Sequence, residues 1–328
     1  MMQFLKMFFL LFLIAEFLKR VVLFSRGRGF FRPKRFISPW FTAYDAPVPH
    51  ERNGLLCFKR GQIARKLTDK NTIRIICLGD STTINVPTVN HYPKLLQDKL
   101  NNFYKNVRFE VLNAGADAFT TAHSLVNLAL KLRYFSPDCI IVCHNITDLS
   151  SVYFLPSLET DYANKYMDNL FLAAECKTGI QRLLLPSRLL SSALMKWNEA
   201  MFERKAKSMD IGREDIKLGG EIFETNLKNI VKIAETDGIK VILGAQPGCF
   251  RKKTAKFSYI KEKDFREYNK AVQKVAAEQN AVFADCFSGL GQQPEYFVDL
   301  VHNTESGVEK VSEVYFETIK RIYSDVKK

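Results

Sequence analysis

The pattern of apolar and polar residues becomes regular at about residue 71. From there, short apolar runs rich in β-branched residues predict strands, and longer helix-like segments separate them. The predicted strands are 72–80, 107–115, 139–145, 239–247 and 281–286. The predicted helices are 91–105, 124–135, 223–238, 264–280 and 307–325. Because strands alternate with helices, we expect an α/β fold with a five-stranded parallel sheet covered on both faces.

This rhythm is interrupted at about 151–220, where Leu- and Met-rich helical stretches predict an insertion. As a functional element, the insertion would be a lid, an acceptor-binding surface or a second membrane contact. The alternative is a pair of surface helices, each with one apolar face. The predicted organisation is a membrane anchor or interfacial helix at 1–32, a connector at 33–70, and a main domain at 71–328 that contains the insertion.

The N-terminus is strongly apolar over residues 4–24, with an unbroken apolar run at 7–15. Counted through Glu16, Lys19 and Arg20, the segment is about long enough to cross a bilayer, although these charges would be costly at its centre. Two alternatives stay open: a single transmembrane helix, or a helix that lies in the membrane interface. No small-x-small cleavage site follows, which argues against a cleavable signal peptide.

The charge distribution supports a lipid partner. The chain has 328 residues and a formal net charge of +13, and residues 1–40 hold eight Lys or Arg against one acid, Glu16. Because much of the excess lies beside the apolar segment, we expect membrane lipid as a partner and no nucleic acid. The basic flank follows the apolar run, so the positive-inside tendency favours the cytoplasmic face for the main domain.

The cysteines indicate neither a disulfide framework nor a zinc site. There are seven of them, an odd number, and no CxxC spacing occurs. Three of them, at 77, 139 and 143, lie in or beside apolar runs, where cysteine behaves as a small hydrophobic residue.

Two sites carry residues suited to nucleophilic catalysis. Ser81 follows the first predicted strand and a Gly-Asp turn, and ligands of such sheets bind beyond the carboxyl ends of the strands. Asp299 and His302 lie between the last predicted strand and the last helix. A three-residue gap lets the carboxylate hold one imidazole nitrogen, so that the other can take the serine proton. Taken alone, each site is equally typical of a helix start.

Together these motifs resemble the SGNH (GDSL-like) hydrolase family over about residues 71–322. The resembling blocks are GDST at 79–82, VLNAGADAFTT at 111–121, PDCIIVCHNITDL at 137–149, IKVILGAQP at 239–247 and DLVHNTESG at 299–307. The resemblance implies a flavodoxin-like three-layer sandwich. It also implies a serine esterase or deacylase that needs no metal or organic cofactor.

The resemblance assigns the roles. Ser81 would be the nucleophile, His302 the base and Asp299 its partner, with an acyl-enzyme intermediate. The oxyanion would be held by backbone N–H groups, including that of Ala118, where the family usually has glycine. Thr147 stands where the family has an oxyanion asparagine, and Asn145 stands where it has glycine. A shorter hydroxyl would therefore replace an amide, unless Asn145 reaches the site instead.

The remaining polar residues of these blocks are predicted to be structural. Asp80 would order the nucleophile turn and Asp148 the third loop. We expect His144 to be structural or substrate-facing rather than catalytic, and His123 to lie at a capped helix start.

The substrate stays open at this stage. The family acts on acylated small molecules, glycans or lipids, either by hydrolysis or by acyl transfer to an acceptor hydroxyl. The alternative from another class is a non-catalytic SGNH-like module that binds a glycan or a partner at the membrane, which the changes at Ala118 and Thr147 would favour.

Overall fold

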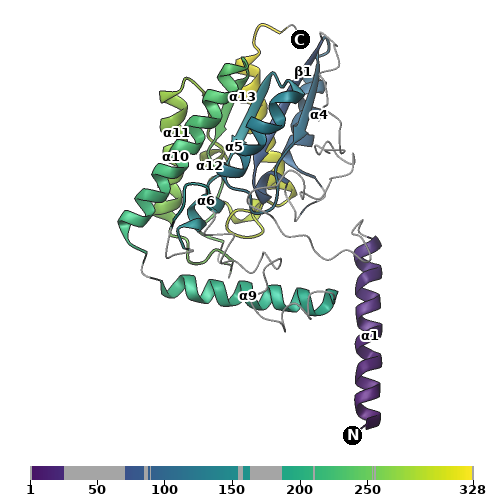
Figure 1. The fold of residues 1–328 in the computed structure, drawn as a ribbon. Coiled ribbons are helices and arrows are strands. Elements are labelled where there is room, and N and C mark those ends of the chain that lie inside the picture. The colour runs from purple at the N-terminus through teal and green to yellow at the C-terminus, as the bar shows by residue number, and fades with distance from the viewer. Residues whose placement is uncertain are drawn as a thin grey trace.

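A computed structural model describes residues 2–25, 71–84, 88, 90–153, 158–162, 187–209, 211–252, 254 and 256–326. At its centre lies a five-stranded parallel sheet with the strand order β2-β1-β3-β4-β5 (Figure 1). The strands are β1 (Thr72–Gly79), β2 (Arg108–Asn113), β3 (Cys139–Cys143), β4 (Lys240–Gly244) and β5 (Val282–Ala284). The predicted sheet is confirmed, and its order is that of flavodoxin-like folds.

The central strands are buried on both faces, which explains their continuous apolar sequences. β3 is buried throughout, and β1 is buried from Arg74 onward. The register pairs Gly79 of β1 with Cys143 of β3, and Cys143 with Gly244 of β4. The carboxyl ends of three neighbouring strands therefore lie side by side, and the loops that follow them meet at one edge of the sheet.

Alternate residues of the strands enter two separate cores. On one face, Ile76 and Leu78 pack with apolar residues of α5 (Thr121–Leu130), α10 (Arg213–Thr236) and α11 (Glu262–Glu278). On the other face, Ile75 and Cys77 pack with α4 (Tyr92–Phe103) and α13 (Glu305–Ile322). The rings of Tyr92 and Tyr315 stack between these two helices. The three-layer sandwich is formed by these two helical layers and the sheet.

Short helices connect these layers, and most of them follow the carboxyl end of a strand. They are α3 (Ser81–Ile84), the 3-10 helix Leu132–Phe135, α6 (Ile146–Ser151), α12 (Cys286–Leu290) and the 3-10 helix Pro294–Tyr296.

Within the predicted insertion, the structure describes one long helix, α9 (Arg188–Ser208), which crosses one end of the domain. The next helix, α10, begins at Arg213 rather than at the predicted 223. Its first turn carries Glu214 and Asp215, whose negative charge suits a helix N-terminus. The predicted connector, 33–70, lies outside the described residues.

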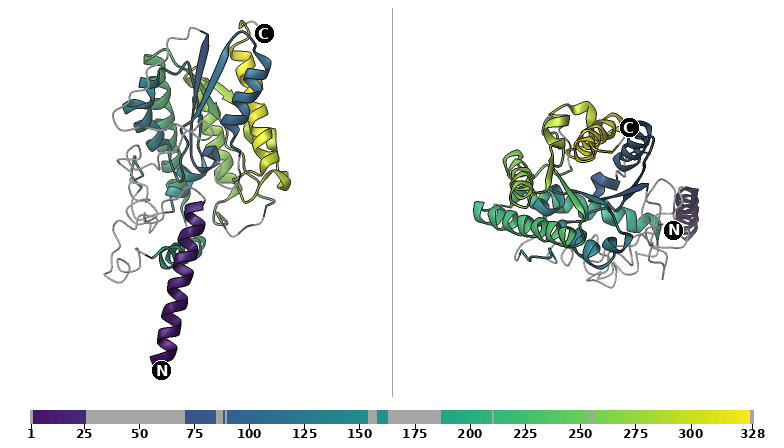
Figure 2. Two further views of the ribbon diagram at one scale, coloured as in Figure 1. Left: turned by 90° about the vertical axis from the view of Figure 1, so that its right-hand side faces the viewer. Right: turned by 90° about the horizontal axis from the view of Figure 1, so that it is seen from above.

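The N-terminal segment forms the helix α1 (Met2–Ser25), which extends away from the domain (Figures 1 and 2). Among the helices that the structure describes, none is long and apolar enough to cross a membrane. The prediction of a transmembrane helix is therefore not supported. The physical reason lies in the charges, because Glu16, Lys19 and Arg20 interrupt the apolar sequence within the helix.

Candidate active site

The nucleophile candidate lies at the carboxyl end of β1. Ser81 begins the short helix α3, directly after Gly79 and Asp80. A Cβ at position 79 would lie 2.0 Å from the Thr83 hydroxyl oxygen and 2.8 Å from the Cys143 carbonyl oxygen. Glycine is therefore required at position 79 for the close approach of β1 and β3 beneath Ser81.

The base candidate lies in the loop between the 3-10 helix Pro294–Tyr296 and α13. Asp299 Oδ1 accepts the backbone N–H groups of Val301 and His302, at 3.0 and 2.9 Å. The loop is closed by an antiparallel bridge between Phe297 and Asn303. These bonds form a tight turn, which brings the His302 imidazole next to the Asp299 carboxylate.

The three side chains form one hydrogen-bonded chain. Ser81 Oγ lies 2.8 Å from His302 Nε2, and His302 Nδ1 lies 2.7 Å from Asp299 Oδ2. Ser81 and His302 are buried, with 6% and 4% of their surfaces exposed. With Nδ1–H donating to the carboxylate, Nε2 is the acceptor that faces the serine hydroxyl. This is the geometry of an activated nucleophile.

The surroundings of Asp299 keep its carboxylate ionised. Burial alone would raise the pKa of Asp299, but the hydrogen bond and charge of His302 outweigh it. Together with the two backbone N–H groups, they lower the pKa to about 2. A carboxylate that stays charged stabilises the imidazolium that forms when His302 takes a proton.

The three predicted oxyanion residues have different surroundings in the structure, and they do not all face the site. Ala118 has a φ of 61°, in the left-handed region, which explains why glycine suits this position. The Thr147 hydroxyl donates to Asp80 Oδ2 at 3.3 Å and lies 3.5 Å from Asp148 Oδ2. The Asn145 amide instead donates to two groups of α11, the Phe265 carbonyl and Asn269 Oδ1. The structure therefore directs Asn145 into the scaffold.

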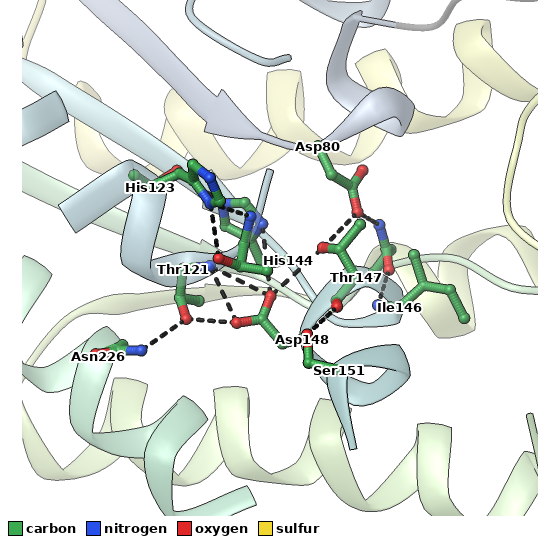
Figure 3. A network of polar contacts seen from close by, with 12 residues as sticks. Asp80, Thr121, His123, His144, Ile146, Thr147, Asp148, Ser151 and Asn226 are labelled. Carbon is green, nitrogen blue, oxygen red and sulfur yellow. Dashed lines mark hydrogen bonds and ion pairs between the residues drawn. The ribbon is translucent and has the colours of Figure 1, made fainter. Parts of the chain in front are cut away.

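Asp80 joins the loops after β1, β3 and β4 (Figure 3). It is fully buried, and its Oδ1 accepts the backbone N–H and the hydroxyl of Thr82, both at 2.8 Å. Its Oδ2 accepts the amide of Gln246, at 2.9 Å, besides the Thr147 hydroxyl. Gln246 also accepts the backbone N–H of Ile146. Asp80 thus orders the nucleophile turn and fixes it to its neighbours.

Asp148 does the same for the second and third loops (Figure 3). It is fully buried, and its Oδ1 accepts the backbone N–H and the hydroxyl of Thr121, at 3.0 and 2.5 Å. Thr121 begins α5, so this carboxylate holds the helix that directly follows Ala118.

Neither of the other two candidate histidines faces Ser81. His144 Nε2 lies 2.7 Å from Ser124 Oγ, and its Nδ1 lies 3.8 Å from Asp148. His123 Nδ1 accepts the backbone N–H of Thr120, which completes a capping box at the start of α5. Both histidines therefore bond to groups in α5 or at its start.

Two features of the site have no signal in the sequence pattern. Gln246 was predicted to lie within the strand 239–247, but β4 ends at Gly244, and nothing in the spacing of Gln246 distinguishes it. Phe257 has a φ of 60°, and its ring lies beside the His302 imidazole, with 6.4 Å between the ring centroids. The loop between β4 and α11 carried no motif that would have identified it.

Comparisons with known proteins identify the family of the protein. The profile of the GDSL-like lipase/acylhydrolase family matches residues 77–310, a range that includes Ser81, Asp299 and His302. A comparison with curated protein sequences finds no match.

Solved structures with partial likeness include three esterase or lipase structures. A lipase/acylhydrolase from Enterococcus faecalis is 16% identical, with a TM-score of 0.48 over 76% of this chain and 96% of that one. An acetylxylan esterase from Geobacillus stearothermophilus is 14% identical, with a TM-score of 0.48 over 75% and 94%. A GDSL-like lipase from Bacteroides thetaiotaomicron is 14% identical, with a TM-score of 0.45 over 76% and 88%.

Proposed function

Because the chain belongs to the GDSL-like lipase/acylhydrolase family, we propose that it is a serine ester hydrolase in which Ser81, His302 and Asp299 form the catalytic triad. The observation that carries the proposal is the continuous hydrogen-bonded chain from Ser81 Oγ through His302 to Asp299. Ser81 and His302 are 221 positions apart in sequence, so local structure alone does not bring them together.

The reaction begins with attack of Ser81 Oγ on the ester carbonyl carbon, while His302 Nε2 takes the hydroxyl proton. The tetrahedral intermediate then collapses, and the leaving alcohol takes the proton from His302. The acyl group remains as an ester on Ser81. Water or an acceptor hydroxyl attacks this acyl-enzyme, with His302 again taking its proton and returning it to Ser81.

The negative charge of the intermediate would be held by the backbone N–H groups of Ser81 and Ala118, with the Thr147 hydroxyl as a third donor. The hydroxyl would turn from Asp80 towards the oxyanion as charge develops there. Loss of one such donor costs on the order of 100- to 1000-fold in rate in other serine hydrolases. Thr147 is preferred to Asn145, whose amide is used by α11.

The substrate class that we propose is an acyl or acetyl ester on a carbohydrate or lipid. If water resolves the acyl-enzyme, the protein is a hydrolase, and if an acceptor hydroxyl does, it is an acyltransferase. Neither route calls for a metal or an organic cofactor, because the serine, the imidazole and the amide groups perform every step.

We also propose that α1 attaches the protein to a membrane as its single N-terminal helix. Ten of its large apolar side chains, between Met7 and Val22, are exposed. The basic residues that follow the apolar run favour the cytoplasmic face.

The test of the catalytic proposal is hydrolysis of p-nitrophenyl acetate by the full chain and by its S81A and H302A variants. We expect both variants to lose at least about 1000-fold in kcat. S324A, which removes an exposed serine near the C-terminus, should keep full activity. Equal rates in all four proteins, with no labelling of Ser81 by a fluorophosphonate, would instead favour a non-catalytic module that binds its ligand.

A further inference from the structure

Helices α1 and α9 form a corner at one end of the domain. Figures 1 and 2 show α9 lying across that end, with α1 beside the start of α9 and extending away from the sheet. This is the end that carries the triad, because Glu203 of α9 accepts the backbone N–H of Phe257, whose ring lies beside His302.

The corner is held by one carboxylate. Glu16 of α1 accepts hydrogen bonds from Arg20, from the Ser187 hydroxyl and from the Leu189 backbone N–H, at 2.9, 2.9 and 2.8 Å. The last two groups belong to the start of α9, where the helix dipole favours an anion. Glu16 is 9% exposed, so the single acid of residues 1–40 is withdrawn from the surface.

Both helices expose apolar side chains around this corner. On α9, Leu190, Trp197 and Met201 are 36%, 60% and 43% exposed. Their spacing of seven and four residues puts them on one face of the helix. On α1, exposed apolar side chains cover more than half of the helix circumference, mostly on the sides away from Glu16. Contiguous apolar surface of this kind marks an interaction site.

The charge beside this apolar surface is positive. Exposed Arg204, Lys205 and Lys207 occupy the end of α9, and Lys19 lies on α1 just beyond Glu16. In the sequence, five further Lys or Arg follow between residues 26 and 35 with no acid among them. Cations beside exposed apolar and Trp side chains match the headgroup layer of an anionic bilayer.

We propose that α9 lies flat in the headgroup layer of an anionic membrane, with the N-terminal half of α1 inserted at a slant into the adjacent leaflet, so that the long side chain of Lys6 reaches towards the headgroups. Residues 2–15 form about 21 Å of helix, which is longer than the roughly 15 Å of one leaflet and shorter than the hydrocarbon core of about 30 Å. The charges of Glu16, Lys19 and Arg20 then lie at the level of α9. The end of the sheet that carries Ser81 faces the lipid. Resting on the proposed function, this orientation assigns the ester to a membrane amphiphile rather than to a freely dissolved molecule.

The test uses Trp197 as its reporter, since Trp40 is the other tryptophan in the chain. The full-length W40F variant is added to vesicles of equal parts phosphatidylcholine and phosphatidylglycerol. We expect the Trp197 emission to shift to shorter wavelength, to be quenched by brominated acyl chains, and to respond less at high salt or with pure phosphatidylcholine. If W40F fails to fold, the difference between the natural chain and W197F isolates the same signal.

A matched control carries its tryptophan at the opposite end of the sheet. Tyr134 is 55% exposed there, and a triple variant W40F/W197F/Y134W should bind the same vesicles without a spectral shift. Three results would overturn the proposal: no binding to the vesicles, binding without a response of Trp197, or a Trp197 signal that is already shielded without lipid. The last would mean that another part of the chain or a second copy covers this face of α9.

The membrane proposal and the catalytic proposal can be tested separately. W197S should hydrolyse dissolved p-nitrophenyl acetate at the unaltered rate, while its rate on p-nitrophenyl palmitate presented in anionic vesicles should fall below that of the natural chain. If the soluble ester is not cleaved by any protein, the catalytic proposal fails and the vesicle fluorescence still stands on its own.

Discussion

The carboxylate of Glu203 accepts the backbone N–H of Phe257 at 2.8 Å. Phe257 has a φ of 60°, a backbone conformation that costs a bulky residue about 1–2 kcal/mol, and its ring lies beside the His302 imidazole. The same carboxylate accepts the Ser258 hydroxyl at 3.3 Å. The helical insertion therefore helps to hold a strained residue at the wall of the site.

We expect E203A to weaken this wall without disturbing the triad. Release of Phe257 from its left-handed conformation should raise KM for an ester about 3- to 10-fold and lower kcat less, a loss of about 1 kcal/mol in substrate binding. Steady-state kinetics on p-nitrophenyl acetate and butyrate measure this split. E203Q retains an acceptor oxygen and is the matched control; an equal defect in both variants would contradict the hydrogen-bond argument.

The depressed pKa of Asp299 predicts a pH-dependent contribution to stability. The unfolded carboxyl has a pKa of 3.8 and the folded one about 2, so the contribution is complete above pH 4 and is lost as the pH falls from about 4 to 2. Its size is about 2 kcal/mol. D299N lacks it, so the difference in free energy of unfolding between the two proteins should shrink over that range. Urea denaturation at several pH values measures it.

The same variant separates stability from catalysis. At pH 7, D299N should lose about 10,000-fold in kcat, because the amide no longer holds the imidazole in its reactive tautomer. A stability difference that stays constant from pH 5 to pH 2 would argue against the ion pair as its source.

Replacement of Thr147 tests the third oxyanion donor. T147V keeps the shape of the side chain and removes the hydroxyl, and we expect kcat to fall about 10- to 100-fold with little change in KM. T147S retains the hydroxyl and should stay within about 3-fold of the natural enzyme. A large defect in T147S, or none in T147V, would assign the oxyanion to backbone groups alone.

The left-handed backbone of Ala118 predicts opposite results for two substitutions. A118G relieves the conformation and keeps the N–H, so we expect its stability to change by less than about 1 kcal/mol and its activity to be retained. A118V places a β-branched residue at a φ of 61° and should lose about 2 kcal/mol or more, with a fall in kcat as the loop moves. Thermal denaturation and ester kinetics on both variants check this.

Much of the fold could be predicted, because apolar runs and their alternation with helices are properties of the sequence itself. The strand at 139–143 is buried throughout, and its sequence CIIVC is continuously apolar. The residues of the proposed triad could be singled out for a related reason. Ser81 follows one strand directly, and Asp299 and His302 are close enough in sequence to bond within one turn.

The rest depends on contacts between distant segments. The direction of Asn145 is decided by Asn269, which lies 124 residues away on α11. The role of Gln246 follows from Asp80, which reaches it from another strand. The start of α10 was predicted too late, because its first turns are polar and gain their stability from capping rather than from an apolar face.

The spacing of these residues along the sequence also has a consequence for protein synthesis. Ser81 is translated 221 residues before His302, and the two meet only when distant segments pack together. A ribosome-bound chain that ends before His302 would therefore carry the proposed nucleophile without its proposed base. Premature termination anywhere before residue 302 should release products without the proposed esterase activity.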